Sequence, residues 1–551
     1  MIAICLSHAV APHHRQPVTE ENMVTQLLVR RNFYCDSVAL MTLSRSLTAL
    51  PDVEDAAAVM STEMNQTLLT QAGLLPADKA GTEIGGPNDL LVVVRAASEE
   101  AAAVALQAAE RGLQARHSGE TGPQAEQRLV SLEQAVARQP ALNLALISVP
   151  GAYAAIEARQ ALLAGLHVLL FSDNVSLEQE VALKTLANER GLLMMGPDCG
   201  TAIINGVGLG FANAVPRGPI GLVSASGTGL QQVTCLIAEY GLGISQALGT
   251  GGRDLSQAVG GRAMLAGLDL LQHDPQTRVI VLLSKPPAPE VARRVIAGAA
   301  QGSKHAVIAF LGAAPDAADI QIAGHLRFAS ALGDAARLAV QLAGGQAPSS
   351  GDTLPDDTQS AIQRARAALK PGQRYVRGIF SGGTLCDEAM ALLSARLGPI
   401  YSNIPLRPDW RLADATTSRE HTAIDFGSDE FTIGRPHPMI DAGLRLRRLA
   451  QEAADPATAV ILLDIVLGYG AHADPASEFA PAIEAARAAA AEDGRALACI
   501  VSLCGTAHDP QGLAYQRDTL SQAGALVFTE NARAARAAAE IVSGLAVKSR
   551  A

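Results

Sequence analysis

The segment Gly221–Gln232 reads GLVSASGTGLQQ and places small hydroxyl residues and glycines where an apolar strand pattern gives way to a helical one. Free backbone N–H groups and the positive end of the helix dipole converge at such a point and attract anions. Glycine lets the backbone approach the ligand, and hydroxyl groups add donors. We therefore expect a phosphate-class anion to bind at Ser226, Gly227, Thr228 and Gly229. A serine or threonine that only caps the helix has the same geometry, so both roles stay open.

A nucleophilic Ser226 is the competing interpretation of the same segment. The nucleophile elbow needs glycines on both sides in a Gly-x-Ser-x-Gly pattern. Here Ser224 and Thr228 occupy the two glycine positions. The pattern therefore argues against a catalytic serine.

A second glycine-rich segment, GTGGRDLS at 249–256, adds a cation. Gly251 and Gly252 permit close approach of a ligand, and the guanidinium fork of Arg253 suits a phosphate or a carboxylate. We expect Asp254 to hold that arginine in place. The alternative is an ordinary ion pair within a loop.

Two further loops could contribute to a site. The segment SGGT (Ser381, Gly382, Gly383, Thr384) forms either a secondary anion loop or a structural turn. In GRPHPMID, two prolines stiffen the backbone around His437, and Arg435 lies beside it. Such a loop can grip a carboxylate and polarise a carbonyl, unless it is an exposed connector with an idle histidine.

Lys285, in LSKPPA, is a further candidate for substrate binding or catalysis. Cys199, in GPDCGT, is expected in a turn, and no histidine or lysine neighbours it in sequence to activate its thiol.

Strand-like runs alternate with helical patterns along almost the whole chain, which predicts a multidomain α/β protein. From residue 141 the order strand-helix-strand-helix-strand predicts a doubly wound parallel sheet. A stretch rich in Gly, Pro, Ser and Asp at 344–357 separates the last part of the chain. The expected strand segments are 25–34, 55–62, 89–96, 141–150, 166–173, 192–196, 221–226, 243–252, 278–285 and 305–312, followed by segments within 375–393, 459–472, 496–509 and 525–530.

Composition limits the function classes. A chain of 551 residues is too long for one core, and a formal charge of −11 offers no basic surface for nucleic acid. Seven scattered cysteines predict reduced thiols rather than disulfides or a metal site. We find no apolar run long enough to span a bilayer and no basic region before the apolar start, so we expect a cytoplasmic protein without a signal peptide.

A weak internal repeat relates the middle of the chain to its end. GLVSASGTGLQQ is similar to GIFSGGTLCDEA (378–389), and HAVIAFLG (305–312) is similar to ACIVSLCG (498–505). A true duplication would place two related sheets face to face, with the loops at their strand ends around one site.

GPDCGT, GLVSASGTGLQQ and GTGGRD, in that order, resemble the α subunit of succinyl-CoA synthetase. AIDFGSDEF (423–431), VILLDIVLGYG (460–470) and CIVSLCGTAHDPQG (499–512) are similar to the CoA-ligase domain of its β subunit. With FYCDSVALM (33–41), SDNVSLEQE (172–180), LSKPPA (283–288) and GRPHPMID (434–441), residues 24–545 resemble the FdrA family, which fuses the two.

The resemblance implies a Rossmann-like CoA-binding-type domain and two flavodoxin-like ligase-type domains, preceded by a small α/β domain. The expected division is a loose tail (1–23), an N-terminal α/β domain (24–117), a connector (118–140), a CoA-binding-type domain (141–217), an α-like ligase domain (218–343), a linker (344–373) and a β-like CoA-ligase-type domain (374–547).

The chain departs from the synthetase pattern where the phosphoryl group is carried. Those ligases use a histidine in Gly-His-Ala-Gly, whereas His325 here is followed by leucine and arginine. Lys285 stands in the region where the family has a glutamate that orients the histidine. No segment has an ATP-grasp or Walker pattern.

The FdrA resemblance implies a subunit of an oxamate carbamoyltransferase in allantoin catabolism, acting with partner subunits. The substrates would be oxalurate and phosphate, or oxamate and carbamoyl phosphate, with no cofactor or metal required. The alternative is an acyl-CoA synthetase that works with a nucleotide-binding partner, in which CoA persists as an inherited ligand. A non-catalytic scaffold is the third hypothesis.

Overall fold

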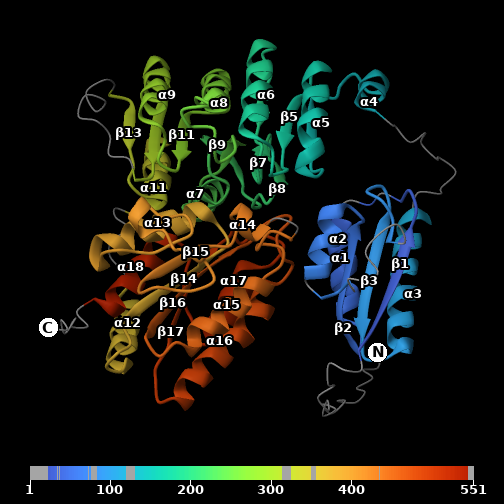
Figure 1. The fold of residues 1–551 in the computed structure, drawn as a ribbon. Coiled ribbons are helices and arrows are strands. Elements are labelled where there is room, and N and C mark those ends of the chain that lie inside the picture. The colour runs from blue at the N-terminus through green and yellow to red at the C-terminus, as the bar shows by residue number, and fades with distance from the viewer. Residues whose placement is uncertain are drawn as a thin grey trace, which may run out of the picture. The chain divides into compact units, whose positions relative to one another are not determined.

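The computed structural model describes residues 23–33, 35, 37–71, 73–75, 84–118, 131–312, 324–348, 355–432 and 435–543. Residues 1–22 of the expected tail lie outside them. The chain divides into two compact units, residues 1–129 and 130–551, which are described separately (Figure 1). No helix among the described residues is long and apolar enough to cross a membrane.

The N-terminal unit is a three-stranded antiparallel sheet in the order β1-β3-β2 with helices between the strands. The central strand β3 reads LLVVVRA, and its five aliphatic residues are fully buried because helices pack against both of its faces. The three strands predicted here are present, and α-helices accompany them. They are β1 (Val24–Arg30), α1 (Ser37–Thr48), β2 (Val53–Met60), α2 (Glu63–Gln71), β3 (Leu90–Ala96) and α3 (Glu99–Ser118).

The second unit begins with a parallel three-stranded sheet in the order β4-β5-β6. The connecting helices bury alanines and leucines against it, as the predicted alternation of strands and helices requires. Its elements are α4 (Leu132–Arg138), β4 (Leu144–Ile147), α5 (Gly151–Leu163), β5 (His167–Leu170), α6 (Leu177–Glu189) and β6 (Met194–Met195).

A seven-stranded sheet follows, in the order β13-β12-β11-β9-β10-β7-β8. Its hairpin β7–β8 pairs antiparallel with β10 and was not predicted, although Asn205-Gly206 is a strong hairpin signal and both residues have positive φ. The strands are β7 (Thr201–Ile204), β8 (Val207–Gly210), β9 (Arg217–Ser224), β10 (Ile244–Gly249), β11 (Val279–Ser284), β12 (His305–Phe310) and β13 (Leu326–Phe328).

The last part contains a parallel five-stranded sheet in the order β15-β14-β16-β17-β18. This order repeats that of β10-β9-β11-β12-β13, so the two halves share one topology, as the predicted sequence repeat requires. The strands are β14 (Tyr375–Phe380), β15 (Thr422–Asp425), β16 (Thr458–Val466), β17 (Ala498–Cys504) and β18 (Leu526–Phe528).

Helices cover both larger sheets. One of them, α12, lies inside the segment expected as a linker. They are α7 (Gly227–Glu239), α8 (Arg262–His273), α9 (Pro289–Gln301), α11 (Leu332–Leu342), α12 (Asp356–Ala368), α13 (Gly383–Leu397), α14 (Asp429–Thr432), α15 (Gly443–Ala454), α16 (Pro475–Glu492), α17 (Leu513–Gln522) and α18 (Asn531–Val542).

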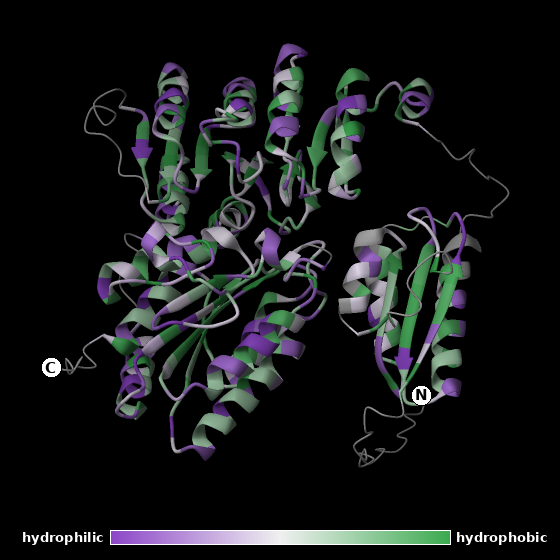
Figure 2. Cartoon of the chain, in the orientation of Figure 1, coloured by the Kyte–Doolittle hydropathy of each residue, from purple (hydrophilic) through white to green (hydrophobic). Residues whose placement is uncertain are grey.

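The two larger sheets of the second unit share one hydrophobic core. Apolar residues of α7, α11, α13 and α18 pack between them in a single cluster, and the strands behind are mostly apolar (Figure 2). The Sγ atoms of Cys235 on α7 and Cys504 on β17 lie 3.9 Å apart within it. Gln232 on α7 also donates to the Thr529 carbonyl of the second half at 2.9 Å. The relative position of the two halves is therefore set by packing, and loops from both can form one site.

Candidate functional site

Helix α7 begins directly after β9, at the segment expected to bind an anion. Ser226 is its N-cap, and the Ser226 Oγ accepts a hydrogen bond from the Gly229 N–H at 2.9 Å. Within the described residues, the N–H groups of Gly227 and Thr228 have no hydrogen-bond acceptor. The capping role is confirmed, and two backbone donors remain at the helix terminus.

The N-terminus of α13 meets that of α7. Ser226 Oγ donates to Thr384 Oγ1 at 2.6 Å, and both side chains are buried. A Cβ atom at Gly382 would lie 2.5 Å from Thr228 Cγ2, so only glycine allows this approach. The predicted SGTG and SGGT segments therefore come together, although more than 150 residues separate them in sequence.

The SGGT segment already holds an anion from the chain itself. The Asp464 carboxylate, on β16, accepts from the backbone N–H groups of Ser381 at 2.7 Å and Gly382 at 2.9 Å. Arg445 Nη2 donates to Asp464 Oδ1 at 2.7 Å, and both side chains are buried. The carboxylate occupies the N–H groups of Ser381 and Gly382, whereas the N–H groups of Gly383 and Thr384, in the first turn of α13, have no acceptor among the described residues. A secondary anion loop at SGGT therefore stays a prediction.

No carboxylate among the described residues accepts from the corresponding turn before α7. Counted from the two helix starts and the strand registers, the residue of the first half that corresponds to Asp464 is Leu283. A leucine side chain cannot accept a hydrogen bond, so the internal anion of the second half has no counterpart in the first. The two related turns therefore differ in the acceptor behind the helix: the Ala225 N–H donates to the Leu283 carbonyl at 2.9 Å, whereas the corresponding Ser381 N–H donates to the Asp464 carboxylate.

Lys285 follows β11 and reaches across to the second half. Its Nζ lies 3.4 Å from Asp387 Oδ2 on α13. A Cβ at Gly383 would lie 2.7 Å from both Lys285 Nζ and Asp425 Oδ2, which places these groups together beside the α13 terminus. Burial by itself would lower the pKa of Lys285, but the carboxylates of Asp387 and Asp425 raise it above its usual value. The lysine is thus a cation at the junction of the halves.

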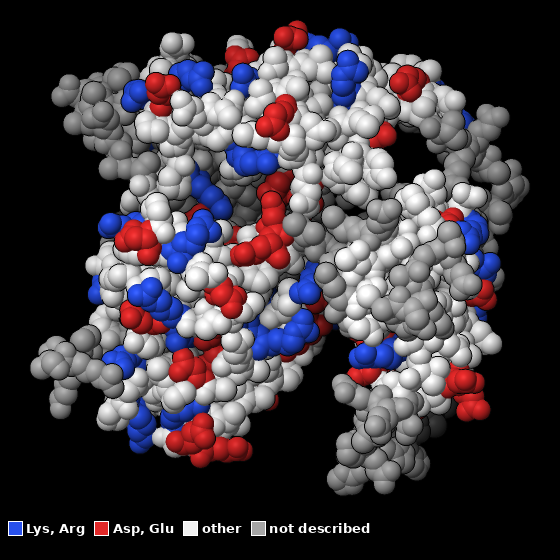
Figure 3. Space-filling model, in the orientation of Figure 1, with Lys and Arg blue, Asp and Glu red and all other residues white. Residues whose placement is uncertain are grey.

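Asp198, in the GPDCGT turn, adds an ionisable group of unusual pKa. Its side chain has solvent contact. Desolvation by the surrounding protein atoms, together with the carboxylates of Asp173 and Asp429, raises its pKa to about 7. The charges of Lys285 and Arg253 act in the opposite direction. Acidic and basic side chains gather where the two halves of the second unit meet (Figure 3).

The Cys199 thiol is unreactive in this setting. It is buried, and its Sγ lies 3.4 Å from the Gly249 carbonyl oxygen. Burial raises the pKa of Cys199 to about 12, so the thiolate is not formed at neutral pH.

Arg253 is held by a residue that the sequence analysis did not consider. Its Nε donates to Glu180 Oε2 at 2.9 Å and its Nη2 to the Val175 carbonyl at 2.7 Å. Asp254 does not hold the arginine, contrary to our expectation. The Asp254 carboxylate is fully buried and accepts from Lys184 and from the first turn of α8. Its role is structural because no part of it reaches a ligand.

His437 is neutral and oriented. Burial lowers its pKa to about 4, with a smaller contribution from the Arg445 charge. Its Nδ1 accepts from the Met439 N–H at 3.2 Å, which leaves the proton on Nε2 as a donor. The ring packs on Phe211, with centroids 5.2 Å apart. Arg435 is exposed, and a single ligand shared by Arg435 and Arg253 stays a prediction.

His325 lies at the wrong edge of the sheet for a phosphoryl carrier. It precedes β13, which runs parallel to β12, whereas Ser226 and Lys285 follow the ends of their strands. A six-residue strand separates the two edges by about 20 Å. Residues 313–323, outside the described part, contain no histidine.

The sequence analysis missed the carboxylates that surround Lys285 and the α13 terminus. Asp425 and Asp464 each stand in an apolar strand, in AID and LLD, close to the carboxyl edge of the sheet. An isolated acid in such a position was the available signal, because ligands bind at this edge in parallel α/β sheets.

Comparison with known proteins agrees with this architecture. Residues 379–541 match the CoA-ligase family, and residues 23–129 match the family described as AllF, heavy metal-associated domain. The chain is 30% identical over 154 residues to the α subunit of the ADP-forming succinate–CoA ligase of Aquifex aeolicus, covering 27% of this chain and 49% of that one. The fold and site define a succinyl-CoA synthetase-like protein with both ligase-type halves in one chain.

A relative matches over nearly the whole length. The uncharacterized protein YahF of Escherichia coli K12 is 44% identical over 520 residues, 94% of this chain and 99% of that protein. The chain belongs to the FdrA family. Among solved structures, an acetyl-coenzyme A synthetase of Ca. Korarchaeum cryptofilum covers 73% of this chain at 16% identity, with a TM-score of 0.27.

The name of the N-terminal family raises the question of a metal. Residues 23–129 contain a single cysteine, Cys35, and no Cys-x-x-Cys pair. No group of three or more His, Cys, Asp or Glu residues in the described part of the chain could hold a metal ion. These residues do not fit a thiolate metal site, and we derive no step through one.

Proposed function

We propose that this protein is a subunit of a carbamoyltransferase that interconverts oxalurate plus phosphate with oxamate plus carbamoyl phosphate. The observation that carries the proposal is that the N–H groups of Gly227 and Thr228 have no acceptor among the described residues, whereas His325, the histidine of the interval where the synthetases carry the phosphoryl group, lies at the opposite edge of the sheet. Carbamoyl transfer needs a phosphate site and a carboxylate site, but neither ATP nor a phosphohistidine.

The proposal assigns a binding role to each candidate residue. Gly227 and Thr228 would hold phosphate through their backbone N–H groups and Arg253 through its guanidinium, with Ser226 as the cap that orients the helix terminus, while Lys285 offsets the charge. Gly229, Gly251 and Gly252 would let the backbone approach it. Arg435 would bind the oxalurate carboxylate. The neutral His437 would donate from Nε2 to a substrate carbonyl, which polarises it without adding a charge.

The chemical step would balance as follows. A phosphate oxygen forms a bond to the ureido carbonyl carbon, the C–N bond to the oxamate nitrogen breaks, and that nitrogen takes up a proton. Asp198, with a pKa of about 7, can supply this proton and take up the proton that the attacking hydrogen phosphate loses. The reverse reaction uses the same groups in the opposite protonation states.

An acyl-CoA ligase is the second candidate, and the CoA-ligase match over residues 379–541 favours it. That activity would need a nucleotide-binding partner and a phosphoryl carrier. The position of His325 opposes it.

The test is to express the chain with and without its genomic neighbours and to assay phosphate-dependent breakdown of oxalurate beside ATP- and CoA-dependent thioester formation. We expect carbamoyl phosphate and oxamate from the assembled subunits, and no acid-labile phosphate on the chain. Thioester formation with a phosphorylated histidine would contradict the proposal and establish the ligase.

A further inference from the structure

We infer that two buried charged residues of α6, Glu180 and Lys184, position the guanidinium of Arg253 for anion binding. The inference rests on the proposed function, because it assigns the anion site to Arg253. It concerns residues that do not touch the substrate and act through the arginine.

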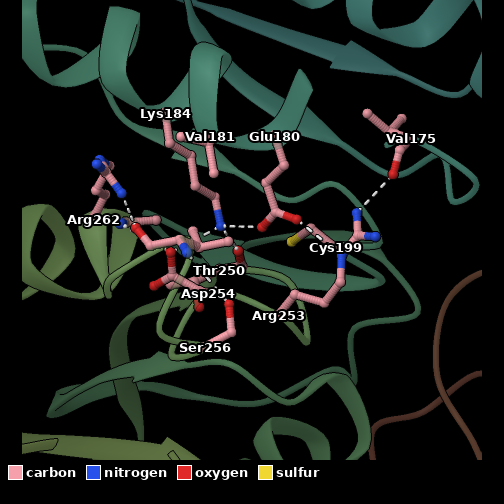
Figure 4. Close-up of polar contacts among 12 residues, drawn as sticks. Val175, Glu180, Val181, Lys184, Cys199, Thr250, Arg253, Asp254, Ser256 and Arg262 are labelled. Carbon is pink, nitrogen blue, oxygen red and sulfur yellow. Dashed lines mark hydrogen bonds and ion pairs between the residues drawn. The ribbon is translucent and has the colours of Figure 1, made fainter. Parts of the chain in front are cut away.

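Lys184 is the centre of the network (Figure 4). Its Nζ donates to Glu180 Oε1 at 2.8 Å, to the Thr250 carbonyl at 2.8 Å and to Asp254 Oδ1 at 2.9 Å. An ammonium group has three hydrogens, so these three acceptors satisfy it completely. The side chains of Lys184 and Glu180 are each 1% exposed. The lysine therefore ties α6 to the glycine-rich loop that contains Arg253.

Glu180 divides its two oxygens between the two cations. Oε1 accepts from Lys184 and Oε2 accepts from Arg253 Nε at 2.9 Å. Arg253 Nη2 donates to the Val175 carbonyl at 2.7 Å, so two separate acceptors fix the plane of the guanidinium. Its side chain is nevertheless 47% exposed, and no acceptor among the described residues contacts Nη1. The arginine is held on one side and open on the other.

Asp254 links the loop that contains Arg253 to the first turn of α8. It accepts from the backbone N–H of Met264 at 2.8 Å and of Ala263 at 3.2 Å. These bonds cap α8, whose N-cap Gly261 has no side chain to do so. Since Asp254 is next to Arg253, the cap also fixes the backbone from which the arginine extends.

The charges of the four side chains in this network balance one another. Glu180 and Asp254 carry two negative charges, and Lys184 and Arg253 carry two positive charges, so the network is neutral. A buried ion pair is seldom more stable than a well-packed apolar substitute, whereas it fixes directions that apolar contacts leave free. Arg253 is also close enough to Asp198 to lower the pKa of that carboxyl group, which places it at the rim of the site.

The test compares Glu180→Gln with Glu189→Gln, the same change at an exposed position of the same helix. Titration of the isolated chain with inorganic phosphate measures binding, and the assembled enzyme gives KM and kcat. We expect Glu180→Gln to weaken phosphate binding and raise KM about tenfold, with kcat within about twofold. Glu189→Gln should behave as the unmodified chain. Unchanged phosphate binding in a folded Glu180→Gln chain would overturn the inference.

A double-mutant cycle separates positioning from a general structural role. Arg253→Gln removes the exposed guanidinium, and in that background Glu180→Gln should have no further effect on phosphate binding. Additive effects would contradict the inference. If Glu180→Gln does not fold, Glu180→Asp, which shortens the reach to Arg253, takes its place in the cycle. If the assembled complex shows no carbamoyl transfer, the proposed function is wrong. The positioning role still holds in that case if Glu180→Gln weakens phosphate binding.

Discussion

Ser226 Oγ donates a hydrogen bond to Thr384 Oγ1 at 2.6 Å and so joins the N-termini of α7 and α13. The same Ser226 oxygen caps its own helix by accepting from Gly229. One hydroxyl group therefore stabilises a helix start and the junction between the two related halves. Substitution at this position tests both roles.

Ser226→Ala should lower the free energy of unfolding by about 2 kcal/mol, because the cap is lost and Thr384 loses its partner. Thr384→Val should lower it by less, and the two changes together should show a coupling of about 1 kcal/mol in denaturant unfolding. Thr384→Ser keeps the hydroxyl group and should restore most of the stability. Strict additivity would mean that the hydrogen bond contributes nothing.

Gly382→Ala should destabilise the protein by about 1–3 kcal/mol, since the new methyl group would lie 2.5 Å from Thr228 and would push the helix termini apart. Gly227→Ala is the matched control in the opposing turn. The nearest atom to a Cβ there is Thr201 Oγ1 at 3.9 Å, so stability should be almost unchanged. Equal effects in chemical denaturation would contradict the close approach of the two turns.

Lys285→Met should weaken phosphate binding by at least tenfold, because it leaves the buried Asp387 and Asp425 carboxylates beside the site without their cation. Burial has already raised the pKa of Asp425 to about 6, and loss of the lysine should raise it further. Lys285→Arg keeps the charge and should retain most of the affinity. Calorimetric titration with phosphate distinguishes the variants. Wild-type affinity in Lys285→Met would exclude the lysine from the site.

His421 gives a predicted dependence of stability on pH. Burial lowers its pKa from 6.5 to about 4. The unfolded chain therefore takes up a proton at higher pH than the folded chain does. The contribution of His421 to the free energy of unfolding is therefore complete above pH 6.5. It falls by up to about 3 kcal/mol as the pH decreases to about 4.

The measurement is thermal unfolding of the unmodified chain and of His421→Asn across this pH range. Asparagine retains an acceptor for the Val376 N–H, which bonds to His421 Nδ1 at 3.2 Å. The variant should lose less stability on acidification. Parallel curves would show that His421 titrates normally in the folded state.

His325→Gln should leave carbamoyl transfer unchanged, because His325 lies at the opposite edge of the sheet from Ser226. Its ring contacts only the Ala299 carbonyl, at 3.3 Å, among the hydrogen bonds of the described residues. Activity of the assembled complex and acid-labile phosphate on the chain are the two readouts. If the unmodified chain carried acid-labile phosphate and His325→Gln lost both this phosphate and the activity, the result would support a phosphohistidine mechanism.

Much of the fold could be predicted because apolar periodicity follows local geometry. The strands β4, β5, β9, β11 and β12 and the helix start at Ser226 were expected, and each depends on residues that are neighbours in sequence. The hairpin β7–β8 escaped prediction because its strands are short and its partner β10 is distant in sequence. The helix α12 was hidden in a stretch whose composition suggested a linker.

The site was less predictable than the fold because charges find partners through space. Sequence proximity assigned Asp254 to Arg253, whereas the fold gives Asp254 to Lys184 and Arg253 to Glu180, which are more than 65 residues away. It likewise gave no sign that Asp464 would fill the SGGT turn. Adjacent residues on a loop often point in opposite directions, so adjacency alone does not identify an ion pair.

By itself the sequence determined the alternating α/β architecture, the internal repeat and the helix start at SGTG, since periodicity and capping act locally. Only the tertiary structure decided that the Asp464 carboxylate binds the backbone of SGGT, and that Lys285 faces Asp387. The physical reason is that both outcomes depend on which side chains the packed core brings to one sheet edge. Those side chains come from strands far apart in the chain.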